Sequence, residues 1–359
     1  MRICSPHCGA EPQSQSGGEV YERELIQSLA AAGHDLHVIL ASHKSSPPGA
    51  GVVHRPYMRK GLRWWVTPFV WPWAIARCWR ECGPFDLLRA HSVRYIGPSC
   101  LIARKVLGLR VPIVTHIHHL DPSPLNGTIE RRVLNASDLV ITDSAFARSQ
   151  LIDLGVEPRK LRVVNSGIAD RYRPMPERAT TRWPGKFLLL ACAQMIERKD
   201  PVWALEVMRH LKARGMEGLV VLAWIGKGPM RTRVERLVNE WGLGNMVAML
   251  GHVSEDEKLG LLNGCDAFLH SSVLEGFALA PQEAMACGKP VIARPAASME
   301  EMVEHGVSGW VTRDAATAAE AVIGWLKRPD ALRRMGKEAQ VRAEARFRWC
   351  HTMAGVEAV

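Results

Sequence analysis

The sequence predicts an α/β protein built from two parallel-sheet domains. Its 359 residues exceed the length of one average domain, and its 47% hydrophobic and 23% charged residues are typical of a folded globular chain. Short apolar stretches typical of strands alternate with helical stretches along the chain, which favours parallel sheets with helices on both faces. A stretch rich in Pro, Arg and Thr separates two such arrays.

The first array occupies residues 1–170. Its expected strands are Arg2–Ser5, Leu36–Leu40, Leu87–Ala90, Pro112–Ile117, Leu139–Thr142 and Leu161–Val164. A polar loop rich in Gly, Ser and Pro follows the first strand. Apolar residues at helical spacing then predict a helix over Glu19–Ala32, which Gly33 ends.

A linker is expected over residues 171–184, where three prolines precede Trp183, and the second domain over residues 185–340. Its expected strands are Phe187–Ala193, Leu219–Ile225, Val247–Leu250, Ala267–His270, Val291–Ala293 and Gly309–Val311. Its clearest helices are Pro201–Gly215, Met230–Trp241 and Ala331–Arg346.

The composition excludes several classes of protein. No stretch of about 18 apolar residues is present, so we expect no membrane-spanning helix, and the N-terminus lacks the pattern of a secretory signal. Nine scattered cysteines are typical of reduced thiols in the cytoplasm. The pairs Cys4/Cys8 and Cys78/Cys82, at CxxxC spacing, are weak metal signals that we interpret as small buried or loop thiols.

The positive charge is concentrated in one segment. Between Leu36 and Leu120, twelve basic residues face only Glu81 and Asp86, so this segment carries the whole net charge of +10 and also holds five of the twelve tryptophans. Basic residues interleaved with Trp suit the surface of an anionic membrane. The expected contact residues are Arg59, Lys60, Arg63, Trp64 and Trp65. The other interpretation is a Trp-filled core with solvated arginines; a nucleic-acid site lacks any accompanying fold signature.

Two carboxylates stand eight positions apart, Glu275 and Glu283, between two of the predicted strands. Pro281 suits the first position of a helix, where its missing N–H costs nothing, and Gly288 suits the left-handed residue past the helix end. We therefore expect Glu275 on the loop that enters this helix and Glu283 in its first turn.

The start of such a helix favours a phosphate or diphosphate, because free N–H groups and the positive end of the helix dipole point outward there. Carboxylates beside it can accept hydrogen bonds from hydroxyl groups. A diphosphate flanked by hydroxyl-bearing rings is the chemistry of a nucleotide-sugar. The alternative is an ordinary strand–loop–helix–strand unit with incidental glutamates.

This segment resembles the Glu-x7-Glu motif of retaining glycosyltransferases of family 4. Gly276-Phe277 follows the first Glu, and the second begins Glu283-Ala-Met-Ala-Cys-Gly-Lys-Pro-Val-Ile-Ala. The resemblance implies the GT-B architecture, in which two Rossmann-like domains face a central cleft. Phe347-Arg-Trp349 resembles the family's C-terminal helix, so residues 341–359 are expected to pack back toward the N-terminal, acceptor-side domain.

A second segment, Ala193-Gln-Met-Ile-Glu-Arg-Lys199, resembles the family's Gly-Arg-Leu-x-x-x-Lys-Gly segment, whose Arg and Lys bind the donor diphosphate. The resemblance assigns Lys199 to catalysis and donor binding. Gln194 stands at the Arg position, where it can donate hydrogen bonds but brings no charge. The alternative is that Lys199 is a surface lysine at a helix entry.

The resemblance also places the rest of the donor site. Glu283 would accept hydrogen bonds from ribose, and Glu275, a catalytic residue, from the transferred sugar. The full set of donor-binding residues is Gly17, Gly18, Gln194, Lys199, Gly226, Val253, Glu275, Gly276, Phe277, Ala278, Leu279 and Glu283. Gly-x-Gly-x-x-Gly is missing near Gly17, which disfavours a dinucleotide oxidoreductase.

His116 and His118 share one face of a predicted strand. Without the resemblance we would interpret them as core histidines; with it, His118 matches the family's active-site histidine. A zinc site is the third interpretation, but no Asp, Glu or Cys stands at ligand spacing. No Asp-x-Asp pair exists in the chain, so we expect no metal on the diphosphate and no cofactor.

We therefore expect a retaining glycosyltransferase that moves a hexose from a UDP- or GDP-sugar to an acceptor hydroxyl. The basic, Trp-rich segment favours a lipid-linked or surface-polysaccharide acceptor, and an enzyme on the inner face of the cytoplasmic membrane. Two alternatives stay open: a nucleotide-sugar 2-epimerase of the same fold, and a non-catalytic sugar- or membrane-binding descendant. The sequence does not decide between UDP and GDP, nor the linkage.

Overall fold

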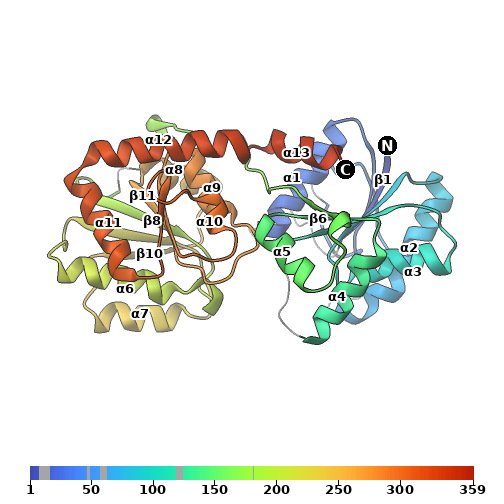
Figure 1. The fold of residues 1–359 in the computed structure, drawn as a ribbon, viewed down its shortest axis with the longest axis horizontal. Coiled ribbons are helices and arrows are strands. Elements are labelled where there is room, and N and C mark those ends of the chain that lie inside the picture. Colours follow the sequence, from blue (N-terminus) through green and yellow to red (C-terminus); the bar gives the residue numbers. More distant parts are fainter. Residues whose placement is uncertain (8–16, 47–48, 57–62, 119–123, 181) are drawn as a thin grey trace. The chain divides into compact units, whose positions relative to one another are not determined.

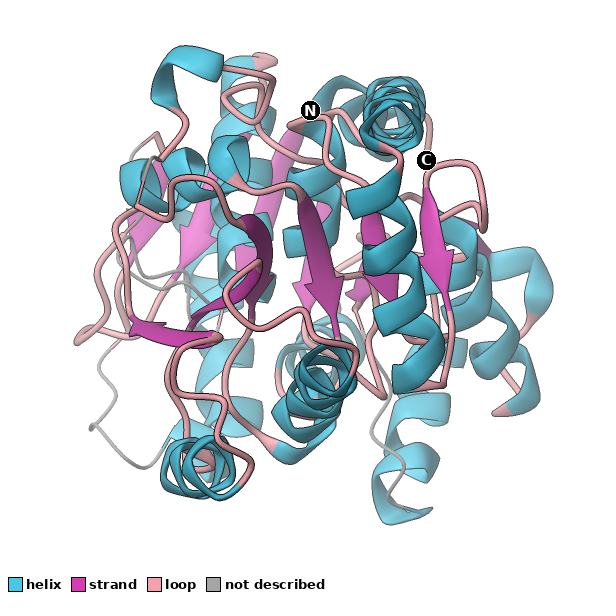
Figure 2. Cartoon of the chain, turned by 90° about the vertical axis from the view of Figure 1, so that its left-hand side faces the viewer, coloured by secondary structure: helices cyan, strands magenta, loops and turns pink. Residues whose placement is uncertain are grey.

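The computed structural model describes residues 1–7, 17–46, 49–56, 63–118, 124–180 and 182–359. They form two compact units: residues 1–166 with 352–359, and residues 167–351. Figure 1 traces both units along the sequence, and Figure 2 shows helices on both sides of the strands.

The first unit contains a seven-stranded, fully parallel sheet in the order β3-β2-β1-β4-β5-β6-β7. The strands are β1 Arg2–Pro6, β2 Asp35–Ile39, β3 Val52–His54, β4 Leu87–His91, β5 Ile113–Ile117, β6 Leu139–Thr142 and β7 Leu161–Val163. The helices are α1 Gly17–Ala31, α2 Arg63–Cys82, α3 Ile96–Val106, α4 Pro124–Ala136 and α5 Ala145–Asp153.

The second unit contains a six-stranded parallel sheet in the order β10-β9-β8-β11-β12-β13. Its strands are β8 Phe187–Cys192, β9 Val220–Ile225, β10 Val247–Gly251, β11 Ala267–His270, β12 Val291–Ala293 and β13 Gly309–Val311. Its helices are α6 Pro201–Ala213, α7 Arg231–Glu240, α8 Glu255–Gly264, α9 Leu279–Ala286, α10 Met299–Met302, α11 Ala315–Lys327 and α12 Pro329–Arg346; α13 spans Trp349–Glu357.

The predicted fold class is confirmed, and every predicted strand is present within two residues of its expected limits. Short 3₁₀ turns also occur at Pro158–Lys160, Pro176–Arg178 and Glu197–Lys199. Strand β3 was not predicted, because Val52–His54 is too short to show alternation. No described helix is long and apolar enough to cross a membrane.

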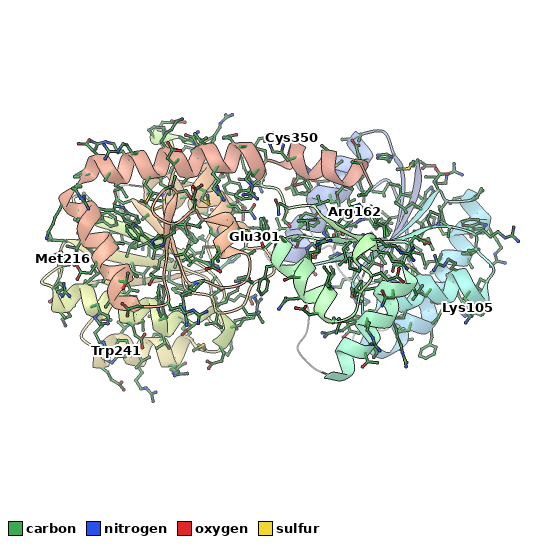
Figure 3. All side chains as sticks on the ribbon, in the orientation of Figure 1. Lys105, Arg162, Met216, Trp241, Glu301 and Cys350 are labelled. Atoms are coloured by element: carbon green, nitrogen blue, oxygen red, sulfur yellow. The ribbon has the colours of Figure 1, made fainter. Side chains whose placement is uncertain are left out.

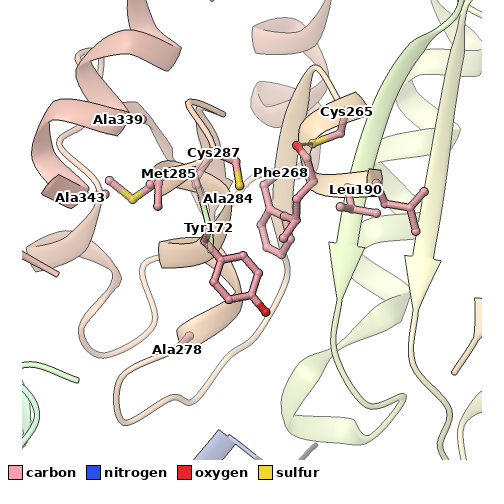
Figure 4. Packing of buried hydrophobic residues seen from close by; sticks show 14 of the residues in the cluster. Tyr172, Leu190, Cys265, Phe268, Ala278, Ala284, Met285, Cys287, Ala339 and Ala343 are labelled. Carbon is pink, nitrogen blue, oxygen red and sulfur yellow. Dashed lines mark hydrogen bonds between the residues drawn. The ribbon is translucent and has the colours of Figure 1, made fainter. Parts of the chain in front are cut away.

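The sheet of the second unit is buried on both faces, which explains the nearly continuous apolar strands. Along β8, Leu188 and Leu190 belong to one hydrophobic cluster, whereas Leu189 and Ala191 belong to the other. Figure 4 shows the first cluster, where Phe268 of β11 and the small or flexible side chains of α9 and α12 pack together with Tyr172.

The proline-rich segment expected as a linker over 171–184 is counted with the second unit. Tyr172 is buried, the Met175 N–H donates to Asn263 Oδ1 at 2.6 Å, and the Thr180 N–H donates to the Gly260 carbonyl at 3.0 Å. These bonds fix the segment along α8.

The end of the chain returns to the first unit. Cys350 is still counted with the second unit and is exposed on α13 (Figure 3). From Thr352 onward the helix belongs to the first: Thr352 Oγ1 donates to the Asn165 carbonyl at 2.8 Å. A Cβ on Gly355 would lie 2.9 Å from Val164, so only glycine fits here without a shift.

Candidate active site

The strand order of the second unit reverses between β8 and β11. In an open parallel sheet the loops that leave the two central strands at such a point diverge, and ligands bind outside the carboxyl ends of those strands. The loop after β8 carries Gln194 and Lys199, and the loop after β11 carries Glu275. The topology therefore brings these distant parts of the sequence to one edge of the sheet.

The loop after β8 is tied to the loop after β11. Ser271 Oγ donates to the Lys199 carbonyl at 2.6 Å, and the Val273 N–H donates to the Arg198 carbonyl at 2.9 Å. Asp200 ends this turn with φ of 41°, a left-handed conformation in which its side chain caps α6. Arg294 donates to the same carboxylate at 2.6 Å. Lys199 is thereby held at a defined place.

Glu275 is 9% exposed and is surrounded by nitrogen groups. Lys199 Nζ forms an ion pair with its Oε1, while Arg198 lies 3.5 Å from Oε2 and His270 Nε2 lies 3.7 Å from Oε1. Burial alone would raise the pKa of Glu275, but Lys199, His270 and Ser272 together outweigh it and the pKa is lowered. Burial lowers the pKa of His270 to about 4, so this ring is neutral at pH 7.

Glu283 is 7% exposed and has its own lysine. Lys258 Nζ of α8 lies 3.2 Å from Glu283 and 3.3 Å from Glu255, and 5.0 Å from the centre of the Tyr172 ring. Burial acts to lower the pKa of Lys258, but Glu283 and its other neighbours raise it well above its usual value. Lys258 is therefore charged, and it pairs with the buried Glu283 carboxylate.

The helix that carries Glu283 begins two residues earlier than predicted. Helix α9 starts at Leu279, so Pro281 is its third residue and Glu283 lies in its second turn; both expected positions were wrong by this shift. The proline is still tolerated, because the first four N–H groups of a helix have no internal partner. Gly288, with φ of 75°, follows the helix end as predicted.

No side chain caps the start of α9 at Ala278, so its outward N–H groups are left for another acceptor. Phe277 is half-buried against the core, with its ring 5.7 Å from that of Phe347 in an edge-to-face arrangement. This packing fixes the loop through Gly276 to Leu279.

Gly226 lies directly after β9 and is needed sterically. A Cβ there would lie 2.1 Å from the Ala193 carbonyl oxygen, and its φ of 128° is strained for any other residue. Gln194 is exposed on the adjoining loop. Val253, expected near the base, is 6% exposed and belongs to the hydrophobic core. Its donor-binding role stays a prediction.

In the first unit the strand order reverses between β1 and β4. Gly17 and Gly18 open α1, and a Cβ on Gly18 would meet no atom within 4 Å. No described neighbour therefore requires a glycine at position 18, and the space beside it is open. Donor contact by these glycines stays a prediction.

Glu22 of α1 is fully buried beneath this edge. Arg89 of β4 binds it through two hydrogen bonds of 2.5 and 2.6 Å, and His91 Nδ1 lies 2.9 Å away. Burial would raise the pKa of Glu22, but Arg89 and His91 hold it well below its usual value. The charge of this carboxylate is thus balanced by a bidentate arginine.

His118 and His116 share the carboxylate of Asp143. His118 Nδ1 lies 2.6 Å and His116 Nε2 lies 3.0 Å from its two oxygens, and the rings stack at 4.5 Å. Burial acts against a charge on both rings and lowers the pKa of His116 to about 4. For His118, Asp143 and Glu22 outweigh burial and raise the pKa to about 10. His118 is therefore a cation at pH 7, held over two carboxylates.

These carboxylates are the ligands that the sequence lacked for a zinc site at His116 and His118. Possible ligand atoms come together in two groups of three residues. One group is Glu22, His91 and His118, and the other is His116, His118 and Asp143. However, Arg89 already neutralises Glu22, and a charged His118 cannot ligate a metal. We interpret the cluster as a hydrogen-bonded network.

The basic segment is less unbalanced than its sequence indicates. Arg89, Arg94 and Arg104 pair with Glu22, Glu130 and Asp138, which all lie outside it. Trp71 is buried in the core of the first unit, as the alternative interpretation expected. Lys105 projects from the end of α3 (Figure 3).

Of the expected membrane-contact residues, Arg59 and Lys60 lie outside the described residues. Arg63, Trp64 and Trp65 form the first turn of α2, with side chains that are not described.

Sequence analysis missed Lys258, Glu22, Arg89 and Asp143. Helix α8 was detectable, because Ser254-Glu-Asp-Glu257 has the pattern of a helix start, and Ser254 Oγ accepts from the Glu257 N–H at 3.1 Å. Predicting α8 would have placed Lys258 on a defined face of that helix. The other three side chains act through partners far away in the sequence.

Two family models together match most of the chain: "Glycosyltransferase Family 4" over residues 15–171 and "Glycosyl transferases group 1" over residues 177–342. An MMP alpha-(1->4)-mannosyltransferase of Mycolicibacterium hassiacum is 30% identical over 413 residues, covering 98% of this chain and 94% of that protein. The amylovoran biosynthesis glycosyltransferase AmsK of Erwinia amylovora is 28% identical over 249 residues, covering 66% of this chain and 60% of AmsK.

The fold is shared with Anabaena HepE, crystallised in complex with UDP and glucose. The TM-score is 0.83, with 20% identity over 100% of this chain and 99% of that chain. The protein belongs to glycosyltransferase family 4 and has the GT-B fold. It is an enzyme that transfers a sugar from a nucleotide-sugar donor. The family match therefore favours glycosyl transfer over the epimerase and the non-catalytic alternatives.

The raised pKa of His118 predicts a distinct titration. The folded-state pKa of about 10 lies above the ordinary value of 6.5, whereas the pKa of Asp143 lies below its ordinary value of 3.8. The pair therefore stabilises the fold fully between pH 3.8 and pH 6.5, and it loses this contribution as pH rises toward 10. NMR of the histidine rings should show one imidazolium at pH 8 that disappears in His118→Gln. Asp143→Asn should lower that pKa by more than one unit. Neutral rings throughout at pH 8 would contradict the assignment.

Proposed function

We propose that the enzyme transfers a hexose, with retention of configuration, from a UDP- or GDP-sugar to an acceptor hydroxyl. One observation supports this most. Two buried carboxylates, each paired with its own lysine, lie on either side of an uncapped helix start at the point where the strand order reverses. This arrangement suits a diphosphate flanked by the hydroxyl groups of a sugar and a ribose.

In this proposal the diphosphate binds the N–H groups at the start of α9, from Phe277 to Leu279, together with Lys199. Lys199 is already charged against Glu275, so a bound diphosphate would share that cation with the carboxylate. As the sugar–phosphate bond breaks, negative charge grows on the departing phosphate, and a fixed ammonium and fixed N–H groups stabilise it. Gln194 adds hydrogen bonds without charge, and exposed Arg198, 3.5 Å from Glu275, supplies a second cation.

Glu275 accepts hydrogen bonds from the transferred hexose, and Glu283 from the ribose. Both roles need ionised carboxylates, and each carboxylate has a lysine beside it. His118, as a cation over Asp143, is proposed to act on the transferred sugar. Retention by front-face displacement is what the family resemblance implies, and an anomeric assignment of the product tests it.

The nucleotide base of the donor can be identified by measuring which nucleotides the enzyme binds. HepE was crystallised with UDP and glucose, and the M. hassiacum relative is named a mannosyltransferase, so uridine and guanosine donors are both candidates. A bound donor raises the unfolding temperature by mass action. Thermal scans with UDP, GDP, UDP-glucose and GDP-mannose would identify the base.

A surface-polysaccharide or lipid-linked acceptor is proposed on two grounds: AmsK is named for amylovoran biosynthesis, and α2 presents a suitable exposed face. Phe69 is 72% and Trp73 is 65% exposed, and Arg77 and Arg80 are exposed on the same side, at intervals of four, four and three residues. Exposed aromatic side chains beside arginines favour an anionic membrane surface, which supports a peripheral location on the cytoplasmic membrane.

The first test removes the carboxylate beside Lys199. Glu275→Gln should lower sugar transfer and donor hydrolysis at least about a hundredfold, because the contacts that align the hexose are lost. Rates are measured with the donor identified above. Glu300→Gln, an exposed glutamate of α10, should leave them unchanged. A folded Glu275→Gln protein with the normal rate would show that the donor lies elsewhere.

The second test concerns metals at the diphosphate. Because Lys199 and the α9 start supply the positive charge, adding Mg²⁺ or Mn²⁺ to enzyme briefly treated with excess EDTA should not change the rate of transfer. An increase in the transfer rate with either ion, reversed by more chelator, would mean that a divalent cation binds the diphosphate instead.

The third test concerns the membrane. Binding to anionic vesicles, measured by sedimentation, should fall steeply as salt is raised, because each basic residue near the surface contributes about 1 kcal/mol and salt screens it. The double variant Phe69→Ala/Trp73→Ala should bind more weakly. Val106→Ala, which removes a 70% exposed side chain of α3, should not. Equal sedimentation with neutral vesicles at low salt would leave only a solvated basic face.

A further inference from the structure

Four side chains of the first unit converge outside the site described above. They are His37 of β2, His54 of β3, and Cys78 and Cys82 of α2, and their ligand atoms all lie within 4.8 Å of one another. His37 Nδ1 is 3.1 Å from His54 Nε2, which is 3.0 Å from Cys78 Sγ and 3.9 Å from Cys82 Sγ. Both cysteines are free.

These separations match the edges of a tetrahedral zinc site. Zinc bonds of about 2.3 Å to sulfur and about 2.0–2.1 Å to nitrogen place neighbouring ligand atoms about 3.3–3.8 Å apart. The measured distances of 3.0, 3.1 and 3.9 Å lie around this range. Small side-chain movements therefore suffice to admit the ion.

One nitrogen of the cluster has more close neighbours than it can hydrogen-bond to. A neutral imidazole nitrogen has either one proton or one lone pair, so it can serve one partner. His54 Nε2 has both His37 Nδ1 and Cys78 Sγ at about hydrogen-bond distance, at 3.1 and 3.0 Å. His54 Nε2 can therefore hydrogen-bond to only one of the two groups, whereas a metal ion accepts all the lone pairs at once.

The surroundings also suit a structural metal. The outer nitrogen of His37, Nε2, lies 3.2 Å from Asp35, the carboxylate–histidine arrangement that orients metal ligands. The Phe85 ring lies 5.6 Å from the His37 ring, and His37 and Cys78 are buried. Cys78 and Cys82 stand one helical turn apart, so both point to the same side of α2.

We propose that this cluster is a structural Zn²⁺ site of the Cys2His2 type. Zinc would bind the two thiolates and the two neutral imidazoles and release the two thiol protons to solvent. The ion would join edge strand β3 and β2 to the end of α2. All four ligand positions would be filled by protein, which leaves no open position for catalysis. Two sulfur ligands favour zinc over Mg²⁺ or Ca²⁺.

The test measures metal in the full chain, purified under reducing conditions without a metal-binding tag. Mass spectrometry of the metal content should find about one zinc per chain. Cys78→Ala, Cys82→Ala and His54→Ala should each lose most of it. Cys100→Ala, a buried thiol of the same unit outside the cluster, should keep it.

A second measurement uses only the wild-type protein, so it does not require that the variants fold. Reduced, zinc-stripped wild-type protein is titrated with Co²⁺, which should give the intense visible bands of a tetrahedral site and a thiolate charge-transfer band, both abolished by one equivalent of Zn²⁺. Zinc should also raise the unfolding temperature of the stripped protein. Wild-type protein with less than about a tenth of an equivalent of zinc and no cobalt bands would overturn the proposal.

Discussion

A buried carboxylate is stable only when a cation lies beside it, and this constraint determines the chemistry at the carboxyl edges of both sheets. Removing one partner of such a pair costs about 3–5 kcal/mol, so each pair has to be maintained as a unit. The pairs are Glu22 with Arg89, Asp143 with His118, Glu275 with Lys199, and Glu283 with Lys258. Because each cation comes from a different segment of the chain than its carboxylate, each pair also holds two segments together.

The pairs also fix the protonation states of the groups in them. Lowered carboxyl pKa values keep Glu275 and Glu22 ionised at neutral pH, and the raised pKa of His118 keeps that ring charged. Lys199 has a fixed position before any donor arrives, because the loops after β8 and β11 are bonded to each other. Groups set in place beforehand stabilise developing charge without the cost of reorganisation.

Much of this could be predicted from the sequence, and the remainder has a physical reason. Strand positions and the loop of Glu275 follow from local pattern, whereas the start of α9 was misplaced because helix ends leave little trace in sequence. The roles proposed for Lys199 and His118 come from the family resemblance; chemistry alone favoured a core histidine at position 118. Side chains that pair with a site residue from a distant part of the sequence, such as Asp143 with His118, were missed. The cluster of His37, His54 and Cys78 was missed too. In both cases only the topology of the sheet brings the residues together.

The second unit is an insertion in the first. Residues 167–351 form it from one continuous stretch, whereas the first unit is completed by residues 352–359. A chain emerging from the ribosome can therefore finish its second unit while the first still lacks Thr352 beside Asn165 and Gly355 against Val164. Domains usually mature in order from the N-terminus. Here the part synthesised first is the last to be closed, because it needs residues 352–359, which follow the whole second unit.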